Sequence, residues 1–385
     1  MQGFVEHLEG TTRLLVPSVS LTRVPPPTAP VFFNPVASLN RDVSVAITAA
    51  SGGSTFCDSM AGVGARGVRV ANEVGRIEKV TLVEFNAAAL GAAKESAALN
   101  RVAGKCEFSD SETTAYLSSR FRGDEKFDCV DVDPFGTPVR QLQAGLGATA
   151  GGGILSVTAT DTAVLCGVYH RVSERRYGAL PLHNHFSHET GIRLLAGVLA
   201  RTGAQVDVGI EPVFAHSTRH YIRLYVKVAP GASSADETLE RLGFVSWCPH
   251  CGHTASLDEV QKSCPDCGKK ARGAGPIWLR GLTAPKLLRG ARESAARLNL
   301  PRAAELVGSL EGIDEFPPWS FSIEEASSSL KVATVPEALA CQALAEAGWK
   351  AMRTPFEKTG VKTDAPYKEF LSAVKSAVSG GRGRP

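Results

Sequence analysis

The feature that most constrains the fold is a regular alternation of short apolar runs with stretches rich in Ala and Leu, between residues 54 and 228. Such an alternation predicts parallel strands with helices on both faces of the sheet. The predicted strands are residues 55–58, 80–85, 106–108, 127–133, 154–158, 206–214 and 220–228, and the predicted helices are residues 65–74, 87–100, 113–121, 139–146 and 190–201. Only a short loop joins the last two strands, so we expect that pair to be antiparallel.

Length and composition are those of a globular protein. The chain has 385 residues, of which 43% are hydrophobic and 21% charged, and this leaves room for two domains. No apolar run is long enough to cross a bilayer, and Glu6 and Glu9 argue against a signal peptide. We therefore expect a cytoplasmic protein with no membrane partner. The sequence leaves the oligomeric state open, with a monomer as the default expectation.

A cluster of Pro, Gly and Ser at residues 229–235 predicts a domain boundary. It separates residues 1–229, whose first thirty residues are polar and Pro-rich, from a second domain of mixed α/β character at residues 236–385. The last residues, 379–385, carry two arginines among glycines and predict a disordered basic tail.

A glycine-containing loop follows the first predicted strand in the segment Asp58-Ser-Met-Ala-Gly62-Val-Gly64-Ala-Arg66-Gly. Glycines at a strand-to-helix turn let the backbone approach a ligand closely, although an ordinary turn also uses them. Glu84, at the tip of the second strand, is placed to accept both hydroxyls of a ribose. Arg66 suits the carboxylate of methionine or a phosphate equally well, so the loop alone does not decide between S-adenosylmethionine and NAD.

Two further polar positions are candidates for the same ligand. Asp110 and Ser111 follow the third strand, where an acid can accept a hydrogen bond from an adenine amino group; the alternative is a helix N-cap. Arg41, which precedes a predicted helix, is a second candidate partner for a methionine carboxylate. A surface salt bridge is the alternative for Arg41.

The fourth predicted strand ends in Asp133-Pro134-Phe135-Gly136. Ligands of open α/β sheets bind beyond the carboxyl ends of the strands, which favours a catalytic role over a plain turn. A carboxylate can accept an N–H of a conjugated exocyclic amine and take its proton as a methyl group arrives. The carbonyl of Pro134 is free to accept the second N–H, and Phe135 can stack on a flat base. Phe32 or Phe33 could close the base from its other face, unless both fill the core.

The most specific local motif is the pair Cys248-Pro-His-Cys251 and Cys264-Pro-Asp-Cys267. Two C-x2-C pairs at this spacing predict four thiolates around one structural zinc ion, in a zinc ribbon at about residues 245–270. A basic run follows, which favours RNA phosphates over a merely solvated face. It consists of Lys269, Lys270, Arg272, Arg280, Lys286, Arg289, Arg292, Arg297 and Arg302. For His183, His185 and His188 we expect loop packing rather than a second metal.

Six strands in alternation with helices, closed by a hairpin, is the arrangement of class I (Rossmann-like) methyltransferases with a seven-stranded sheet. In addition, the segments that begin at Glu9, Phe33, Asn40, Asp58 and Asp133 resemble the archaeal tRNA (guanine(26)-N2)-dimethyltransferase family. His188-Glu189 and Lys362-Thr-Asp-Ala-Pro366 match it too, so the resemblance spans nearly the whole chain.

The resemblance implies an activity and a set of roles. It implies transfer of methyl groups from S-adenosylmethionine to N2 of guanosine at tRNA position 26, giving N2-methyl- and N2,N2-dimethylguanosine. It also implies a C-terminal tRNA-binding domain. Residues near the cofactor would be Arg41, Arg66, Glu84 and Asp110, while Asp133 would handle the guanine amine between Phe32 and Phe135. The alternatives are an RNA-binding protein with a vestigial Rossmann-like domain and a methyltransferase for amines of DNA or protein.

Overall fold

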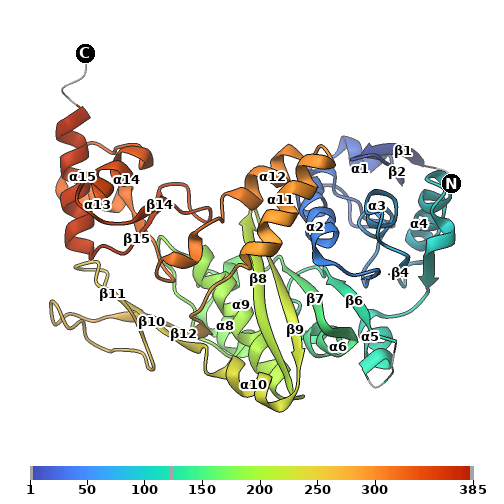
Figure 1. Cartoon of the computed structure of the whole chain (residues 1–385), viewed down its shortest axis with the longest axis horizontal. Coiled ribbons are helices and arrows are strands. Elements are labelled where there is room, and N and C mark those ends of the chain that lie inside the picture. The colour runs from blue at the N-terminus through green and yellow to red at the C-terminus, as the bar shows by residue number, and fades with distance from the viewer. Residues whose placement is uncertain (1–2, 122, 124, 382–385) are drawn as a thin grey trace.

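The computed structural model describes residues 3–121, 123 and 125–381 (Figure 1). At its centre lies a seven-stranded sheet with the order β5-β4-β3-β6-β7-β9-β8. The strands are β5 (Cys106–Ser109), β4 (Lys79–Val83), β3 (Thr55–Asp58), β6 (Phe127–Val132), β7 (Thr149–Ala159), β9 (Tyr221–Pro230) and β8 (Val208–Thr218). β3 to β7 are parallel and the β8–β9 hairpin is antiparallel, which confirms the predicted class I arrangement.

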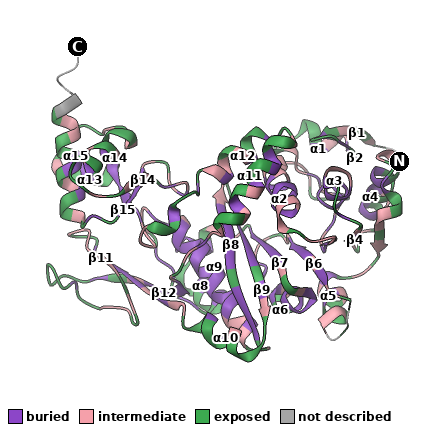
Figure 2. Cartoon of the chain, in the orientation of Figure 1, coloured by how far each residue is buried: buried purple, intermediate pink, exposed green. Residues whose placement is uncertain are grey.

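Helices cover both faces of this sheet. One layer contains α2 (Ser38–Ser51), α3 (Gly67–Glu73) and α4 (Ala87–Leu99), and the other contains α5 (Thr113–Phe121), α6 (Leu142–Ala148) and α9 (Ser187–Ala204). Right-handed crossovers between parallel strands produce these two layers. α9 is apolar on nearly all sides and is almost entirely buried, as Figure 2 shows for the centre of the molecule. Two short helices between β7 and α9, α7 (Thr162–Leu165) and α8 (His170–Tyr177), were not predicted.

The N-terminal segment, expected to be polar and Pro-rich, also contains regular structure that was not predicted. It begins with a hairpin of β1 (Phe4–Glu9) and β2 (Thr12–Pro17), followed by α1 (Val19–Thr22). Leu14 and Val16 are fully buried, and the amide of Leu15 donates a 2.9 Å hydrogen bond to Ser96 Oγ on α4. Alternate apolar residues give this strand one face for the core, so the hairpin packs against the helix layer.

The segment after the sheet continues the main core. α10 (Ala232–Leu239) leads into an antiparallel sheet of β10 (Leu242–Trp247), β11 (Thr254–Leu257) and β12 (Arg272–Trp278). Then come α11 (Pro285–Arg297) and α12 (Pro301–Gly308), which lie beside α2 (Figure 1). Leu288, Ala291 and Ala295 of α11 are buried in the same core as the sheet.

A second, smaller core forms at the opposite end from the N-terminus (Figure 1). Its elements are β13 (Phe321–Ser322), α13 (Ile323–Leu330), α14 (Glu337–Glu346), β14 (Ala351–Arg353), β15 (Gly360–Thr363) and α15 (Tyr367–Gly381). Because α15 continues to Gly381, the expected disorder of residues 379–381 is wrong, and residues 382–385 lie outside the described residues. The division into domains 1–229 and 236–385 stays a prediction. No helix in the described part of the chain has both the length and the apolar character needed to span a membrane.

Candidate active site

Four acidic side chains meet at the carboxyl edge of the parallel strands. Asp58 ends β3, and Glu84, Asp110 and Asp133 are the first residues after β4, β5 and β6. These four strands are direct neighbours in the sheet, so the chain brings the four positions chosen from the sequence to one edge. This edge is where open α/β sheets bind their ligands.

The turn between β3 and α3 needs its glycines. Gly62 and Gly64 have φ values of +52° and +76°, a region that residues with a Cβ rarely adopt. A Cβ on Gly64 would lie 2.8 Å from the Cβ of Ala93. Asp58 is buried and accepts a 2.8 Å hydrogen bond from the amide of Gly67, which ties the two ends of the turn together. Burial, together with nearby negative charges, raises the pKa of Asp58 to about 7.

Glu84 and its neighbours offer the polar and flat surfaces that an adenosine needs. Glu84 accepts 2.8 Å hydrogen bonds from the amides of Gly62 and Asn86, and each carboxylate oxygen keeps a lone pair for a hydroxyl. The next residue, Phe85, is 75% exposed at the strand tip, where its ring can cover a base. Sequence reasoning counted Phe85 only as a strand residue, although its place directly after the acid was a signal. The carboxylate oxygens of Glu84 and the exposed ring of Phe85 therefore fit a nucleoside.

Asp110 is exposed at the same edge, and Ser111 lies beside it with its Oγ 3.0 Å from Ser109 Oγ. The helix-capping alternative for Asp110 is not what the structure contains. Glu112, not Asp110, accepts a hydrogen bond from the amide of Ala115 in the first turn of α5. The carboxylate of Asp110 is thus left facing solvent at the end of β5.

Arg41 lies in a buried ionic cluster rather than a surface salt bridge. Its Nε donates a 2.6 Å hydrogen bond to Glu9, and its guanidinium lies 5.0 Å from the ring centre of Phe33. Arg69, which is fully buried and was not singled out from the sequence, pairs with Glu9 at 2.9 Å and with Asp42 at 2.7 Å. These ion pairs join the β1–β2 hairpin to α2 and α3. A role of Arg41 toward the cofactor stays a prediction.

Arg66 connects the glycine turn to the end of β6. Its guanidinium donates to Asn40 at 2.9 Å, forms an ion pair with Asp131 at 3.2 Å, and donates to Ser44 and Asp133. Four acceptors around one nearly buried guanidinium fix the orientation of Arg66, and with it the carboxylate of Asp133. Asp133 itself remains 27% exposed, so it can still reach a ligand.

Behind Arg66 lies a fully buried ion pair between Asp131 of β6 and Arg223 of β9. Arg223 also donates to Tyr225 at 2.7 Å, and Ser156 donates to Asp131 at 2.6 Å. Burial alone would raise the pKa of Asp131, but Arg223 and Arg66 hold it below its ordinary value. We did not single out either partner from the sequence. The signal was present, because a charge inside a buried strand needs a compensating partner.

The Asp133–Gly136 turn is held by the next strand. The amide of Gly136 donates a 2.6 Å hydrogen bond to Thr160 Oγ1, and the amide of Thr160 donates back to Gly136 O at 2.9 Å. Phe135 is 71% exposed, and its ring meets Phe32 edge-to-face at a centroid distance of 4.9 Å. Phe33 is only 2% exposed and belongs to the core, so it is Phe32 that lies beside the turn.

The four cysteines of the two C-x2-C pairs converge at one point. All four Sγ atoms lie within 4.8 Å of one another, with Cys248–Cys267 at 3.6 Å and Cys251–Cys264 at 3.5 Å. Zn–S bonds of about 2.3 Å would place the sulfurs of a tetrahedron about 3.8 Å apart, so the cluster fits such an ion. Gly252 and Gly268 have φ values of +72° and +70°, as the tight turns after each pair require.

His183 and His185 precede α9 and His188 lies in its first turn, and each of the three has its own hydrogen-bond partner. Nδ1 of His183 lies 3.1 Å from Cys166 O, His185 contacts Ser320 O at 2.9 Å, and His188 contacts Glu357 at 2.8 Å. All three therefore make packing contacts, while the expectation that they bind no second metal stays a prediction.

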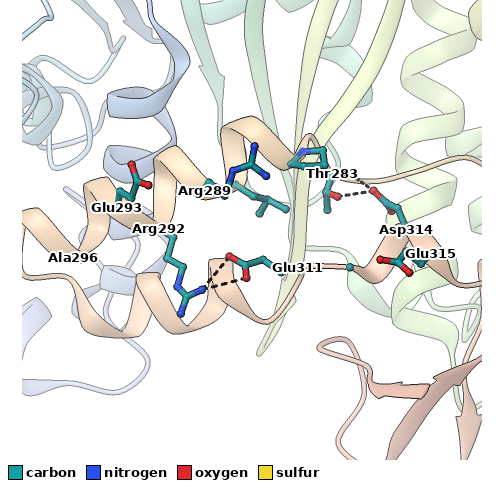
Figure 3. Close-up of a pocket in the computed structure, with 11 residues that line it drawn as sticks. Thr283, Arg289, Arg292, Glu293, Ala296, Glu311, Asp314 and Glu315 are labelled. Atoms are coloured by element: carbon teal, nitrogen blue, oxygen red, sulfur yellow. Dashed lines mark hydrogen bonds and ion pairs between the residues drawn. The ribbon is translucent and has the colours of Figure 1, made fainter. Parts of the chain in front are cut away.

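The nine basic residues of the predicted run are all exposed. Along α11, however, acids offset them. A groove of about 810 Å³ is lined by Arg289 and Arg292, and also by Glu311, Asp314 and Glu315 (Figure 3). Arg292 pairs with Glu311 at 3.1 Å, as the dashed lines in Figure 3 mark. The positive potential of this groove is therefore reduced, and none of the four strand-end acids lines it.

The strand order, the glycine turn and the acids at the strand ends together define a class I methyltransferase. Comparison with known proteins identifies a family within this class. A model of the family described as N2,N2-dimethylguanosine tRNA methyltransferase matches residues 10–375. The chain belongs to this family.

Relatives match over almost their full length. The tRNA (guanine(26)-N(2))-dimethyltransferase of Methanosarcina acetivorans is 35% identical over 97% of this chain and 98% of the relative. The protein of the same name from Methanopyrus kandleri is 35% identical over 97% of each chain. The solved complex of Trm1 from Pyrococcus horikoshii with S-adenosyl-L-methionine has a TM-score of 0.84 at 30% identity, and it covers 96% of this chain and 99% of that one.

Proposed function

We propose that this chain methylates the exocyclic N2 of guanosine at position 26 of tRNA, using S-adenosylmethionine and yielding N2-methyl- and N2,N2-dimethylguanosine. The observation that carries the proposal is the position of Asp133. Its carboxylate is oriented by Arg66, and Pro134 and Phe135 are the next two residues of the chain. The ring of Phe135 contacts that of Phe32. A hydrogen-bond acceptor, a free carbonyl and aromatic rings in one turn suit a flat base with an amino group.

The chemistry asks for proton handling and positioning. The amine of guanine is conjugated with its ring, so it is a poor nucleophile until an acceptor draws on one N–H. Asp133 accepts that N–H, the Pro134 carbonyl accepts the other, and Phe135 stacks on the ring with Phe32 against it. Asp133 takes the proton that N2 releases as its new bond to carbon forms and the methyl–sulfur bond of the donor breaks. A second round needs a second donor molecule and an Asp133 that has passed its proton to solvent, and it replaces the one N–H that is left on N2. The base has to leave the tRNA helix to reach this turn, which is cheapest at a junction between stems.

S-adenosylmethionine supplies an electrophilic methyl group when bound at this edge. We assign its ribose to Glu84, its adenine to Asp110 and Ser111, and its methionine part to the Asp58–Arg66 turn, with Arg41 nearby. The backbone at Gly62 and Gly64 lets the ligand approach. Arg66 contributes in a further way, because the same guanidinium also holds the carboxylate of Asp133.

We also propose that the four-cysteine cluster binds one zinc ion with a structural role. Four thiolates close the coordination shell and leave no position for a substrate. The ion would fix the ribbon between β10 and β12 and support a tRNA-binding region within residues 236–385.

The experiment that tests the activity is nucleoside mass spectrometry. Unmodified tRNA transcript is incubated with the protein and S-adenosylmethionine, digested, and compared with a transcript carrying adenosine at position 26. We expect N2-methyl- and N2,N2-dimethylguanosine from the first transcript only. Methylated guanosine from both transcripts would refute the position, and unmodified nucleosides from both would refute the activity.

The zinc proposal is tested by metal analysis of the purified chain and of Cys264→Ser. We expect one zinc per parent chain and less than one tenth of that in the variant, whose tRNA affinity falls while its affinity for S-adenosylmethionine does not. Cys341→Ser, which removes a cysteine far from the cluster in sequence, is the control and keeps its zinc. A parent chain without zinc, or a variant of unchanged metal content, would contradict the assignment.

A further inference from the structure

Helix α8 and the loop before it form a surface that the chemistry proposed above does not use. Val168 and Tyr169 are 50% and 56% exposed, an unusual position for two large side chains that are adjacent in the chain. Arg171 and Arg175 follow on the same exposed face, one helical turn apart. An exposed tyrosine beside arginines is the combination that binds unstacked bases together with their phosphates.

The two arginines are free to bind an anion. Among the residues that the structure describes, neither Arg171 nor Arg175 forms a salt bridge. Arg176 pairs with Asp161 at 3.0 Å, and Glu174 is the single acid within α8. This differs from the α11 groove, where Arg292 is paired and three further acids line the wall. Positive charge is therefore less compensated on α8 than along α11.

The surface is fixed to the catalytic turn by short hydrogen bonds. Tyr177, at the end of α8, is buried, and its hydroxyl donates a 2.5 Å hydrogen bond to Asp161. Asp161 directly follows Thr160, which exchanges two hydrogen bonds with Gly136 of the Asp133–Gly136 turn. The chain of contacts from α8 to Gly136 thus has only two intermediate residues. The C-terminal end of α8 is therefore connected to the same turn that carries Asp133.

We propose that residues 168–176 form a second tRNA-binding surface, which holds the strand adjacent to the target guanosine while the C-terminal part of the chain holds the rest of the tRNA. The inference rests on the proposed function, since it names a further contact for the same substrate. Arg171 and Arg175 bind phosphates, and Tyr169 stacks on a base that loses its neighbour when the guanosine leaves the helix.

The test compares Arg171→Gln/Arg175→Gln with the matched control Arg76→Gln/Arg101→Gln. The control arginines are also exposed and without a salt bridge among the described residues, but they precede β4 and β5 and so lie at the opposite edge of the sheet. For each variant we measure the KM for tRNA, the kcat, and the tRNA affinity by fluorescence anisotropy at several salt concentrations without S-adenosylmethionine.

We expect the α8 variant to raise the KM and the dissociation constant for tRNA about tenfold, and to reduce the slope of log affinity against log salt by about one to two. The kcat and the affinity for S-adenosylmethionine stay within twofold of the parent, and so does every value of the control. Tyr169→Ala weakens tRNA binding without changing the salt slope, because stacking is not ionic.

An α8 variant whose affinity and salt slope match those of the control would overturn the inference. The anisotropy measurement requires no methyl transfer, so it tests this surface even if nucleoside analysis refutes the proposed activity. Equal losses in both variants would also overturn it, because the binding would then depend on overall charge and not on α8.

Discussion

The ionic groups at the carboxyl edge of the sheet and those that join α9 to β15 are both buried, but they differ in their access to solvent. The first group, here the edge network, consists of Arg66, Asp131, Asp133 and Arg223. The second, here the joint network, consists of Glu189, Arg193 and Lys362. In the edge network the side chain of Asp133 is 27% exposed, whereas every side chain of the joint network is at most 4% exposed.

The joint network is closed and fully hydrogen-bonded. Lys362 donates to both carboxylate oxygens of Glu189 at 2.9 and 2.8 Å, and to the carbonyls of Pro317 and Trp319. Burial alone would raise the pKa of Glu189, but Lys362 and Arg193 hold it below its ordinary value. Such a group connects two parts of the fold and has no capacity left for a ligand. Of the two networks, only the edge network has a member that a ligand can reach, which makes it the candidate for a reaction site.

The largest effect is expected from replacing Asp133, the accessible member of the edge network. Asp133→Ala should lower the rate of tRNA methylation by about 10²–10⁴, the usual contribution of a positioned proton acceptor. Asp133→Asn should lose less, because an amide oxygen still accepts an N–H although it cannot take the proton. Methylation assays under saturating tRNA measure both rates.

Two controls separate chemistry from binding in these variants. Calorimetry should show unchanged affinity for S-adenosylmethionine, and anisotropy should show most of the tRNA affinity retained, since phosphate contacts dominate it. If Asp133→Ala methylates tRNA at nearly the parent rate, Asp133 only shapes the turn.

The second-largest effect is expected on the stability of the protein when a member of the joint network is replaced. Lys362→Met leaves Glu189 with Arg193 as its remaining partner and removes the donor from two carbonyls. We expect the free energy of unfolding to fall by about 3–5 kcal/mol, the cost of breaking a buried ion pair from one side. Urea denaturation measures it.

Lys350→Met is the matched control for that experiment. Lys350 pairs with Glu315 at 2.8 Å, but both side chains are at least 60% exposed. Its loss should leave the free energy of unfolding nearly unchanged, because both partners are well solvated. Equal losses for the two lysines would contradict the distinction between a buried and an exposed pair.

The smallest effect concerns His188, which lies next to the joint network at the partly exposed start of α9. A hydrogen bond to Glu357 raises the pKa of His188 above its usual 6.5. The stabilisation is therefore complete below pH 6.5 and is lost as the pH rises through the pKa of the folded state. His188→Gln should lose less than about 1 kcal/mol at pH 6 and still less at pH 8. Urea denaturation at both values tests this, and a loss independent of pH would argue against it.

The fold was largely predictable because its signal is local. Five parallel strands and their helices alternate along the chain, and each apolar run is long enough to be recognised by itself. The strand ends then placed Glu84, Asp110 and Asp133 at one edge without any further information. The two cysteine pairs could also be recognised from the sequence, because the C-x2-C spacing by itself brings the two thiols of each pair close together.

What the sequence did not predict depends on contacts between distant segments. The partnership of Asp131 with Arg223, and of Glu189 with Lys362, is decided only when strands and helices pack together. The β1–β2 hairpin was missed because its polar, exposed face hid the alternation of Leu14 and Val16. Phe32 and Phe33 are adjacent and chemically identical, so only the packed chain assigns one to the core and the other to the turn.

The salt bridge between Glu189 and Lys362 also has a consequence for biosynthesis. The two residues are 173 positions apart, and Arg193 of the same helix donates to the carbonyls of Trp278 and Arg280. A ribosome that adds about 5–20 residues per second needs roughly ten to thirty-five seconds to deliver Lys362 after Glu189. During that interval α9 carries a carboxylate whose lysine partner does not yet exist, so the joint network cannot form. We therefore expect the nascent chain to bury Glu189 against its lysine partner only after β15 has been made.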